Sequence, residues 1–137
     1  MEQRTHRLTN ERLVGRPVRI EQGYAEVELL TKEEMAVDEY GLVHGGFTFG
    51  LADYAAMLAV NEPTVVLGKA EVRFLKPVKV GEKLTARAGV IEDKGGVGDG
   101  TSPRRKKVVE VEVLNERNEK VFEGTFHCYV LEKHVLE

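Results

Sequence analysis

The stretch from Gly45 to Val60 reads GGFTFGLADYAAMLAV, and Asp53 is its only charged residue. The other side chains are apolar or small on nearly every side, a pattern typical of a helix that is buried all round. A carboxylate inside such a helix is destabilising unless it is solvated, paired or hydrogen-bonded. His44-Gly45-Gly46 mark the start of the helix, where unpaired backbone N–H groups favour an anion. An isolated acid and an anion-binding helix start in one element indicate a catalytic site.

The segments around this helix alternate with a period of two, which predicts strands. The helix is expected to run from about Gly46 to Asn61, where Pro63 ends it. A short helical turn is expected near residues 8–14. One strand is expected before the helix, at Tyr24–Leu30. Four more should follow it, around residues 69–74, 84–90, 109–113 and 122–130, with the late strands as antiparallel neighbours and a glycine-rich loop at 93–103.

One helix against one antiparallel sheet is an α+β arrangement, and 137 residues form a single domain. We expect that domain to span residues 1–137, with about 1–16 as an N-terminal extension. A single helix covers only part of such a sheet. A second subunit is therefore expected to complete the burial, which predicts an obligate homodimer, or a homotetramer of paired dimers.

The composition excludes several classes of protein. Charged residues make up 31% and hydrophobic ones 42%, which is typical of a globular protein, and the net charge of -3 argues against general nucleic-acid binding. The N-terminus is polar and the longest apolar run is too short to cross a bilayer, so we expect no membrane association and a cytoplasmic location. The single cysteine, Cys128, excludes an intrachain disulfide and any cysteine-rich metal site. Because the histidines also lack metal-ligand spacing, no metal is expected.

The block Gly41-Leu-Val-His44-Gly45-Gly46, followed by Leu51-Ala52-Asp53, resembles hotdog-fold acyl-CoA thioesterases of the phenylacetate-degradation type. Downstream, VRFLKPVKVGEKLTARA is similar to the strand–Pro–Gly–strand segment of that superfamily. The resemblance runs from about Tyr24 to the C-terminus. It implies a hotdog fold, in which an antiparallel sheet wraps one long helix. It also implies hydrolysis of an acyl-CoA, with coenzyme A as part of the substrate and no other cofactor.

A second resemblance gives an alternative function. The pieces EVRFLKPVKVGEK and VFEGTFHCYV are also similar to hotdog proteins that bind acyl-CoA without cleaving it. These include the effector domain of a fatty-acid-synthesis repressor and small hotdog proteins of motile host-associated bacteria. Such binders generally lack the helix acid, so Asp53 favours an enzyme. A hotdog hydratase is disfavoured, because the sequence offers no convincing pair of a neighbouring Asp and His.

Thioester hydrolysis needs a base or nucleophile at the carbonyl carbon and donors at the carbonyl oxygen. We expect Asp53 to activate water or attack directly, and the N–H groups of Gly45 and Gly46 to bind the oxygen, while His44 orients the loop or the thioester. Gly45 and Asp53 are separated by about 12 Å along a helix, whereas both must lie within about 3 Å of the reacting group. The spacing therefore predicts a site shared by two subunits, as the resemblance also implies.

Two positions depart from the pattern that the resemblance implies. Relatives place Asn six residues before the histidine, to donate a hydrogen bond near the thioester, whereas Asp38 stands there and accepts when ionised. We still assign Asp38 to substrate binding, although it could have another role or leave the activity weaker. Leu67 occupies a strand position that often carries a polar catalytic helper. Both departures favour the non-catalytic alternative.

The dense basic cluster at residues 104–107 has two interpretations. It is either a solvated strand end or a contact for the phosphates of coenzyme A, which suit Arg and Lys. On the second interpretation Arg104, Arg105 and Lys106 bind substrate. The nearby run Gly95–Gly100 leads into a strand rather than a helix, which favours a hairpin loop over a nucleotide-binding motif.

Overall fold

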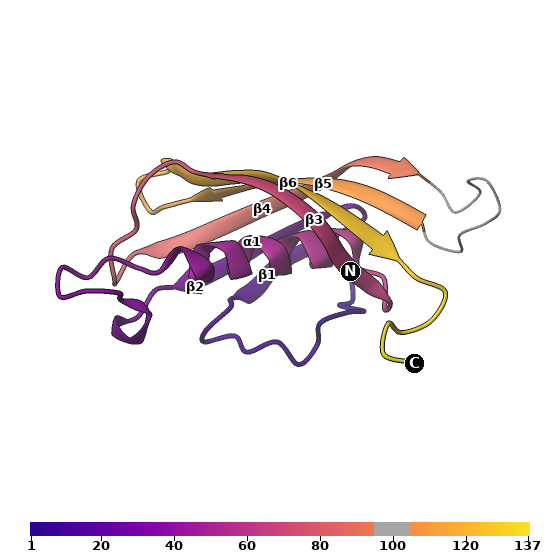
Figure 1. Cartoon of the computed structure of the whole chain (residues 1–137), viewed down its shortest axis with the longest axis horizontal. Coiled ribbons are helices and arrows are strands. Elements are labelled where there is room, and N and C mark those ends of the chain that lie inside the picture. Colours follow the sequence, from indigo (N-terminus) through magenta and orange to yellow (C-terminus); the bar gives the residue numbers. More distant parts are fainter. Residues whose placement is uncertain (95–104) are drawn as a thin grey trace.

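The computed structural model describes residues 1–94 and 105–137, and in them an antiparallel sheet arches over one long helix (Figure 1). The sheet order is β1-β2-β4-β5-β6-β3, so β1 and β3 are the two edges. In chain order the elements are β1 (Arg16–Glu21), β2 (Tyr24–Leu30), the 3-10 helix η1 (Glu33–Met35), α1 (Gly45–Val60), β3 (Val65–Phe74), β4 (Lys83–Lys94), β5 (Arg105–Leu114) and β6 (Lys120–Val130).

The core lies between α1 and the inner face of the sheet. Alternate residues of each central strand point toward the helix, as the period of two requires. Ala86 and Ala88 of β4 are fully buried there, and their small side chains let α1 lie close to the sheet. Every side chain from Tyr54 to Val60 is buried, which is why the helix is apolar on nearly every side. The helix ends at Val60 and is capped by Asn61, which adopts the left-handed conformation and donates its N–H to the Met57 carbonyl at 2.8 Å.

The predicted α+β class and hotdog arrangement are confirmed by this architecture. The strand expected at Tyr24–Leu30 has those bounds, and the helix is displaced by one residue from its expected position. Where the sequence predicts a short helical turn, residues 11–14 form a turn that no helix continues, closed by the hydrogen bond from Val14 N–H to the Asn10 carbonyl at 2.9 Å.

Two details of the predicted secondary structure were wrong. A strand at Arg16–Glu21, β1, was missed because an edge strand exposed along most of its length carries little apolar alternation. The loop expected from Asp93 begins later, because β4 continues to Lys94. The glycine run Gly95–Gly100 and Arg104 lie outside the described residues.

Candidate functional site

Between Leu51 and Val60, Asp53 is the one residue that is half-buried rather than buried. Its Oδ1 atom is nevertheless shielded from solvent and has no hydrogen-bond partner among the described residues. Burial raises the pKa of Asp53 to about 6. At neutral pH this carboxylate is therefore mostly ionised and more basic than an exposed one, as a general base requires.

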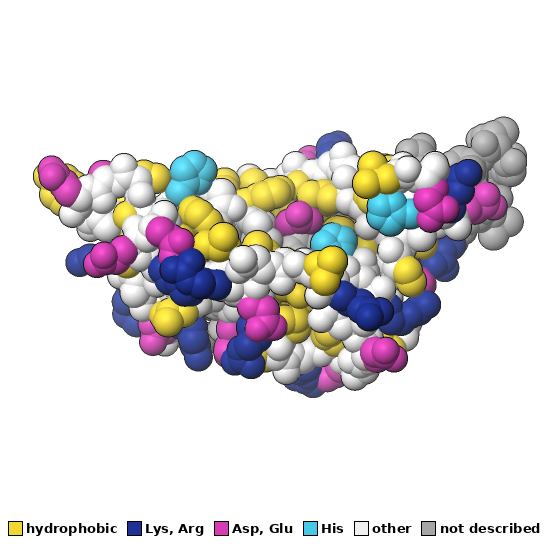
Figure 2. Space-filling model, turned by 90° about the horizontal axis from the view of Figure 1, so that it is seen from below, with side chains coloured by type: hydrophobic (Ala, Val, Ile, Leu, Met, Phe, Trp, Pro, Cys, Tyr) yellow, Lys and Arg dark blue, Asp and Glu magenta, His cyan; other side chains and the backbone are white. Residues whose placement is uncertain are grey.

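A cavity of about 400 Å³ opens beside Asp53, between α1, the start of β3 and the two ends of the chain. Its apolar wall includes Met57 and Leu67. The face seen in Figure 2 shows hydrophobic side chains with acidic and histidine side chains set among them. Besides Asp53, the polar side chains that line the cavity are Thr5, His6, Thr64 and His134. The two histidines come from the terminal segments, where the sequence pattern gave no reason to expect site residues.

Cys128 lies near Asp53 but takes no part in the cavity wall. The thiol is fully buried, and burial, together with the charge of Asp53, raises its pKa to about 12. It is therefore protonated and unreactive at neutral pH. The interpretation of Cys128 as a plain buried thiol is confirmed.

The start of α1 is organised by His44. Its Nδ1 atom accepts a hydrogen bond from the Gly46 N–H at 2.7 Å, which makes His44 the N-cap of the helix. The Gly46 N–H is therefore already engaged. The Gly45 N–H has no hydrogen bond to any described residue and remains available to a ligand. His44 is therefore engaged with the start of the helix, and the orienting role of His44 and the donor role of Gly45 remain predictions.

A second, smaller cavity of about 200 Å³ lies beside Gly45. A side chain at Gly45 would come within 3.1 Å of the Phe74 ring, so glycine is what allows the close approach of that ring. The wall is apolar apart from Thr48 and Lys76, and includes Leu42, Pro77 and Val78. The Gly45 cavity shares no lining residue with the Asp53 cavity. Within one protomer the two predicted catalytic groups are thus not brought together.

Asp38 shapes the loop that leads to His44. Its Oδ1 accepts hydrogen bonds from the N–H groups of Tyr40 at 3.0 Å and Leu42 at 3.2 Å. This is the turn-forming use of an Asp side chain. The carboxylate is exposed and lines neither of the two cavities just described. A role in substrate binding remains a prediction for Asp38.

The described part of the basic cluster begins β5. Arg105 pairs with Glu62 at 3.1 Å, and Glu62 immediately precedes Pro63, which lines the Asp53 cavity. Lys106 is its neighbour on the strand and is partly exposed. Arg105 is therefore close to the cavity, but its charge is already balanced by a carboxylate.

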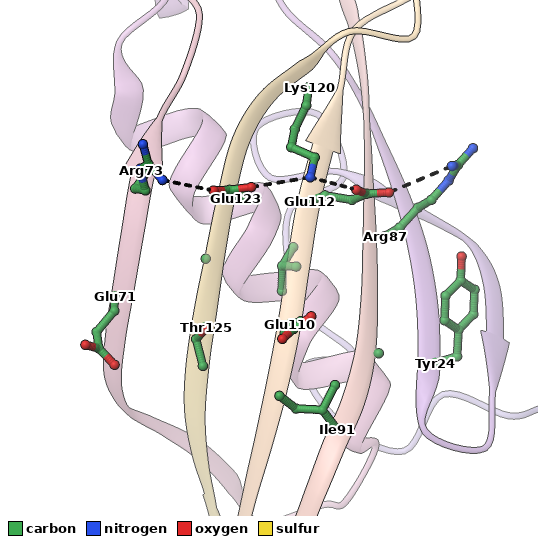
Figure 3. A pocket seen from close by; sticks show the side chains of 13 residues that line it. Tyr24, Glu71, Arg73, Arg87, Ile91, Glu110, Glu112, Lys120, Glu123 and Thr125 are labelled. Carbon is green, nitrogen blue, oxygen red and sulfur yellow. Dashed lines mark hydrogen bonds and ion pairs between the residues drawn. The ribbon is translucent and has the colours of Figure 1, made fainter.

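A further cavity of about 540 Å³ is a hollow on the outer face of the sheet, with α1 behind it (Figure 3). Its charged side chains pair with one another across the strands, Arg73 with Glu123 at 3.6 Å and Lys120 with Glu112 at 3.5 Å. Arg87 continues the row from Glu112 at 4.0 Å. Exposed, mutually paired charges are typical of a solvated sheet face, so we do not place the site there.

In residues 1–94 and 105–137 no group of three or more His, Cys, Asp and Glu side chains is arranged to hold a metal ion. The helices in the same residues are too short or too polar to span a membrane.

The comparisons with known proteins agree with this architecture. The thioesterase superfamily model matches residues 40–94. The crystal structure of an uncharacterized protein from Pyrococcus horikoshii is 68% identical, covers 100% of this chain and 98% of its own, and superposes with a TM-score of 0.91. The PaaI protein of the Escherichia coli phenylacetic acid degradation operon is 25% identical over 82% of this chain and 80% of its own, with a TM-score of 0.68. A Streptococcus mutans protein bound to acetyl CoA is 26% identical over 88% of this chain and 90% of its own, with a TM-score of 0.71.

Two curated relatives are much longer than this chain. A methylthioribose-1-phosphate isomerase from Aquifex aeolicus is 53% identical over 96% of this chain, but the chain spans 26% of its length. The transcription factor FapR from Caldanaerobacter subterraneus is 28% identical over 91% of this chain, which spans 58% of that protein. The names of these relatives therefore describe proteins with additional segments.

Proposed function

This chain belongs to the hotdog-fold thioesterase superfamily, as its HGG and LAD motifs predicted, and on that basis we propose that it hydrolyses acyl-CoA to a free acid and coenzyme A. One observation carries the proposal. A carboxylate with a buried, unpartnered oxygen stands beside a cavity of about 400 Å³. Such a group destabilises the fold, so its presence indicates a functional role. A buried titratable group beside a cavity is typical of a catalytic acid or base.

In the proposed reaction Asp53 accepts a proton from a water molecule while the water oxygen bonds to the thioester carbon. The negative charge that develops on the carbonyl oxygen is stabilised by the free Gly45 N–H at the positive end of α1. The carbon–sulfur bond then breaks, and the proton held by Asp53 is available to the departing thiolate. Direct attack by Asp53, giving an anhydride that water later opens, uses the same groups in a different order.

The proposal requires two subunits, because Gly45 and Asp53 lie in different cavities of one protomer. The surface offers room for a partner along α1. Gly46, Gly50 and Asp53 fall on one side of the helix, and a side chain added at Gly50 would meet nothing within 4 Å. Beside it, the edge strand β3 ends in Phe74, which is 56% exposed. An antiparallel partner helix on this side would bring its Gly45 toward Asp53 and cover the edge.

Coenzyme A is the thiol part of the substrate that the comparisons and the basic residues near the cavity favour. The S. mutans neighbour is described as bound to acetyl CoA. Arg105 supplies a cationic group near the Asp53 cavity through its pairing with Glu62, and Lys106 is assigned to the same role as its neighbour in sequence. Guanidinium groups suit the phosphates of coenzyme A. Arg104 is assigned to the same role from the sequence.

A non-catalytic acyl-CoA sensor is the second candidate. Leu67 lines the Asp53 cavity with an apolar side chain where many enzymes of this fold place a polar helper, and FapR is a regulator rather than an enzyme. In a sensor, Asp53 would contribute to ligand recognition without turnover.

The deciding experiment is hydrolysis of a panel of acyl-CoA thioesters (short, long, branched and aromatic) by wild type and by Asp53→Asn. Released thiol is followed after correction for Cys128. We expect turnover in wild type that is lost in Asp53→Asn while acyl-CoA binding persists. An Asp53→Asn variant with full activity would contradict the proposed mechanism. Tight binding without turnover by both proteins would make the chain a sensor.

A further inference from the structure

The N-terminal segment is held firmly against α1 although it contains no helix or strand before β1. The Asn61 side chain accepts from the Arg4 N–H at 2.7 Å and donates to the Glu2 carbonyl at 2.8 Å. The amide of Gln3 donates to the Tyr54 hydroxyl at 3.0 Å. Tyr54 directly follows Asp53 in the chain, so these bonds fix the segment beside the catalytic turn of the helix.

This anchoring places His6 beside the Asp53 cavity. The residue is one of those that line the Asp53 cavity, although it is exposed overall, and it adopts a left-handed backbone with φ of 54°. A non-glycine residue in that region is strained, and such strain persists only where the surrounding contacts hold it. Here the Gln3 amide also donates to the carbonyls of Thr5, at 2.9 Å, and His6, at 3.2 Å.

The chemistry of the imidazole follows from its neighbours. The Nδ1 atom lies 2.8 Å from the Thr5 hydroxyl. When that hydroxyl donates, the proton of the neutral ring is on Nε2, which leaves Nε2–H as a free donor. Burial of part of the ring lowers the pKa of His6 below its ordinary value, which favours the neutral form. A neutral imidazole donates a hydrogen bond without adding a charge beside Asp53.

The two threonine hydroxyls that line the cavity are already engaged. The Thr64 hydroxyl donates to the Leu131 carbonyl at 2.6 Å, and the Thr5 hydroxyl is in contact with His6. His134 accepts at Nδ1 from the Leu136 N–H at 3.0 Å, and it belongs to the exposed C-terminal tail. Leu67 offers no polar atom. Among the described residues, His6 is thus the better anchored of the two histidines that share the cavity with Asp53, and its Nε2 has no hydrogen bond there.

We propose that His6 is the positioning residue for the attacking water, its Nε2–H donating to the water oxygen while Asp53 accepts the water proton. His6 neither gains nor loses a proton in this step, so the atoms balance as in the hydrolysis described above. The inference rests on the proposed function and deepens it. The N-terminal segment replaces the polar helper that is missing at Leu67.

Two amide substitutions test the proposal. His6→Gln keeps an N–H donor near the position of Nε2, whereas the shorter His6→Asn does not reach it and tolerates the left-handed backbone well. We expect His6→Asn to lower kcat about ten- to hundredfold with little change in KM, and His6→Gln to recover most of the loss. Leu8→Ala, at a fully exposed position of the same segment, is the matched control and should match wild type.

The outcomes separate this inference from the proposed function. A wild-type protein without thioesterase activity overturns both. If wild type is active and Asp53→Asn is not, a kcat of His6→Asn within twofold of wild type overturns the role of His6 alone. Equal losses in His6→Asn and His6→Gln, with unchanged melting temperatures, also overturn it. A comparable loss of kcat in His134→Ala, with His6→Asn unaffected, would assign the donor to the tail instead.

Discussion

Gly45 and Asp53 lie on the same helix, yet they open into two cavities with no lining residue in common. The rise of an α-helix separates them by about 12 Å along its axis. No rearrangement of side chains within one protomer removes that separation, because both positions are fixed by a single rigid element. A reaction that uses both groups must therefore take them from two copies of the chain.

Subunit complementation tests this relationship. We expect Gly45→Val and Asp53→Asn each to be nearly inactive alone, the first by blocking the donor and the second by removing the base. In a mixed dimer one site carries both substitutions and the other carries neither. Random pairing of equal amounts then restores about a quarter of wild-type activity. Activity is measured after co-refolding or co-expression. Absence of any recovery, in a sample shown to contain mixed dimers, would mean that the two groups do not act across an interface.

The stability of Asp53→Asn distinguishes a functional acid from a structural one. The pKa of Asp53 is about 6 in the folded chain, against an unperturbed value of 3.8. The folded state therefore binds a proton more tightly, and its stability falls as pH rises from about 4 to about 6. At pH 8 we expect Asp53→Asn to be more stable than wild type, on the order of 2 kcal/mol, with the difference shrinking by pH 4. Thermal or urea unfolding at both pH values measures this. A less stable Asp53→Asn at pH 8 would indicate a structural carboxylate.

The same titration governs the rate. Asp53 must be ionised to accept a proton or to attack, so kcat/KM should rise with pH through about 6 and level off above it. Below that point the fall should approach tenfold per pH unit. Steady-state rates between pH 4.5 and 8.5 give the profile, and melting temperatures at each pH exclude unfolding as the cause. A rate that is flat from pH 5 to 8 would contradict an Asp53 base.

His44 is expected to act through the helix start. Its Nδ1 caps the Gly46 N–H, and losing an N-cap side chain costs about 1 kcal/mol. We expect His44→Ala to be less stable by about that amount and His44→Asn to keep the cap, with kcat within a few-fold of wild type. Unfolding curves and initial rates of both variants check the two parts. A hundredfold drop in kcat for His44→Asn at unchanged stability would show that the imidazole itself takes part in the chemistry.

The helix and its acid were predictable because their signal is local. Asp53 is the only charged residue in an otherwise apolar helix, so the sequence alone identified it as a candidate site residue. The strand at Tyr24–Leu30 was equally clear, because its buried Ala25, Val27 and Leu29 alternate with Glu26 and Glu28.

The rest of the site depends on contacts between distant parts of the chain. His6 lies at the cavity because the N-terminal segment is held by hydrogen bonds from Gln3 to Tyr54 and from Asn61 to Glu2. Each bond joins residues more than fifty positions apart, and a local sequence pattern cannot predict such a bond. β1 was missed for a related reason, since its pairing with β2 depends on backbone groups rather than on an apolar pattern. The engagement of Gly46 by His44 is likewise a matter of loop geometry.

Substitutions at Arg105 and Glu62 test whether Arg105 binds coenzyme A, because Glu62 balances the charge of Arg105 in the free protein. The guanidinium pairs with Glu62 at 3.1 Å, and the Glu62 side chain is only 24% exposed. If Arg105 binds a phosphate of coenzyme A, the bound anion competes with Glu62 for the same cation. We therefore expect Arg105→Ala to raise KM more than it lowers kcat, and Glu62→Gln to lower KM by freeing the guanidinium. Both effects should weaken as salt screens the charges. Lys83→Ala, at a basic position with no place in the proposed site, is the control. An unchanged KM in Arg105→Ala would identify the pair as a structural clamp between β5 and the end of α1.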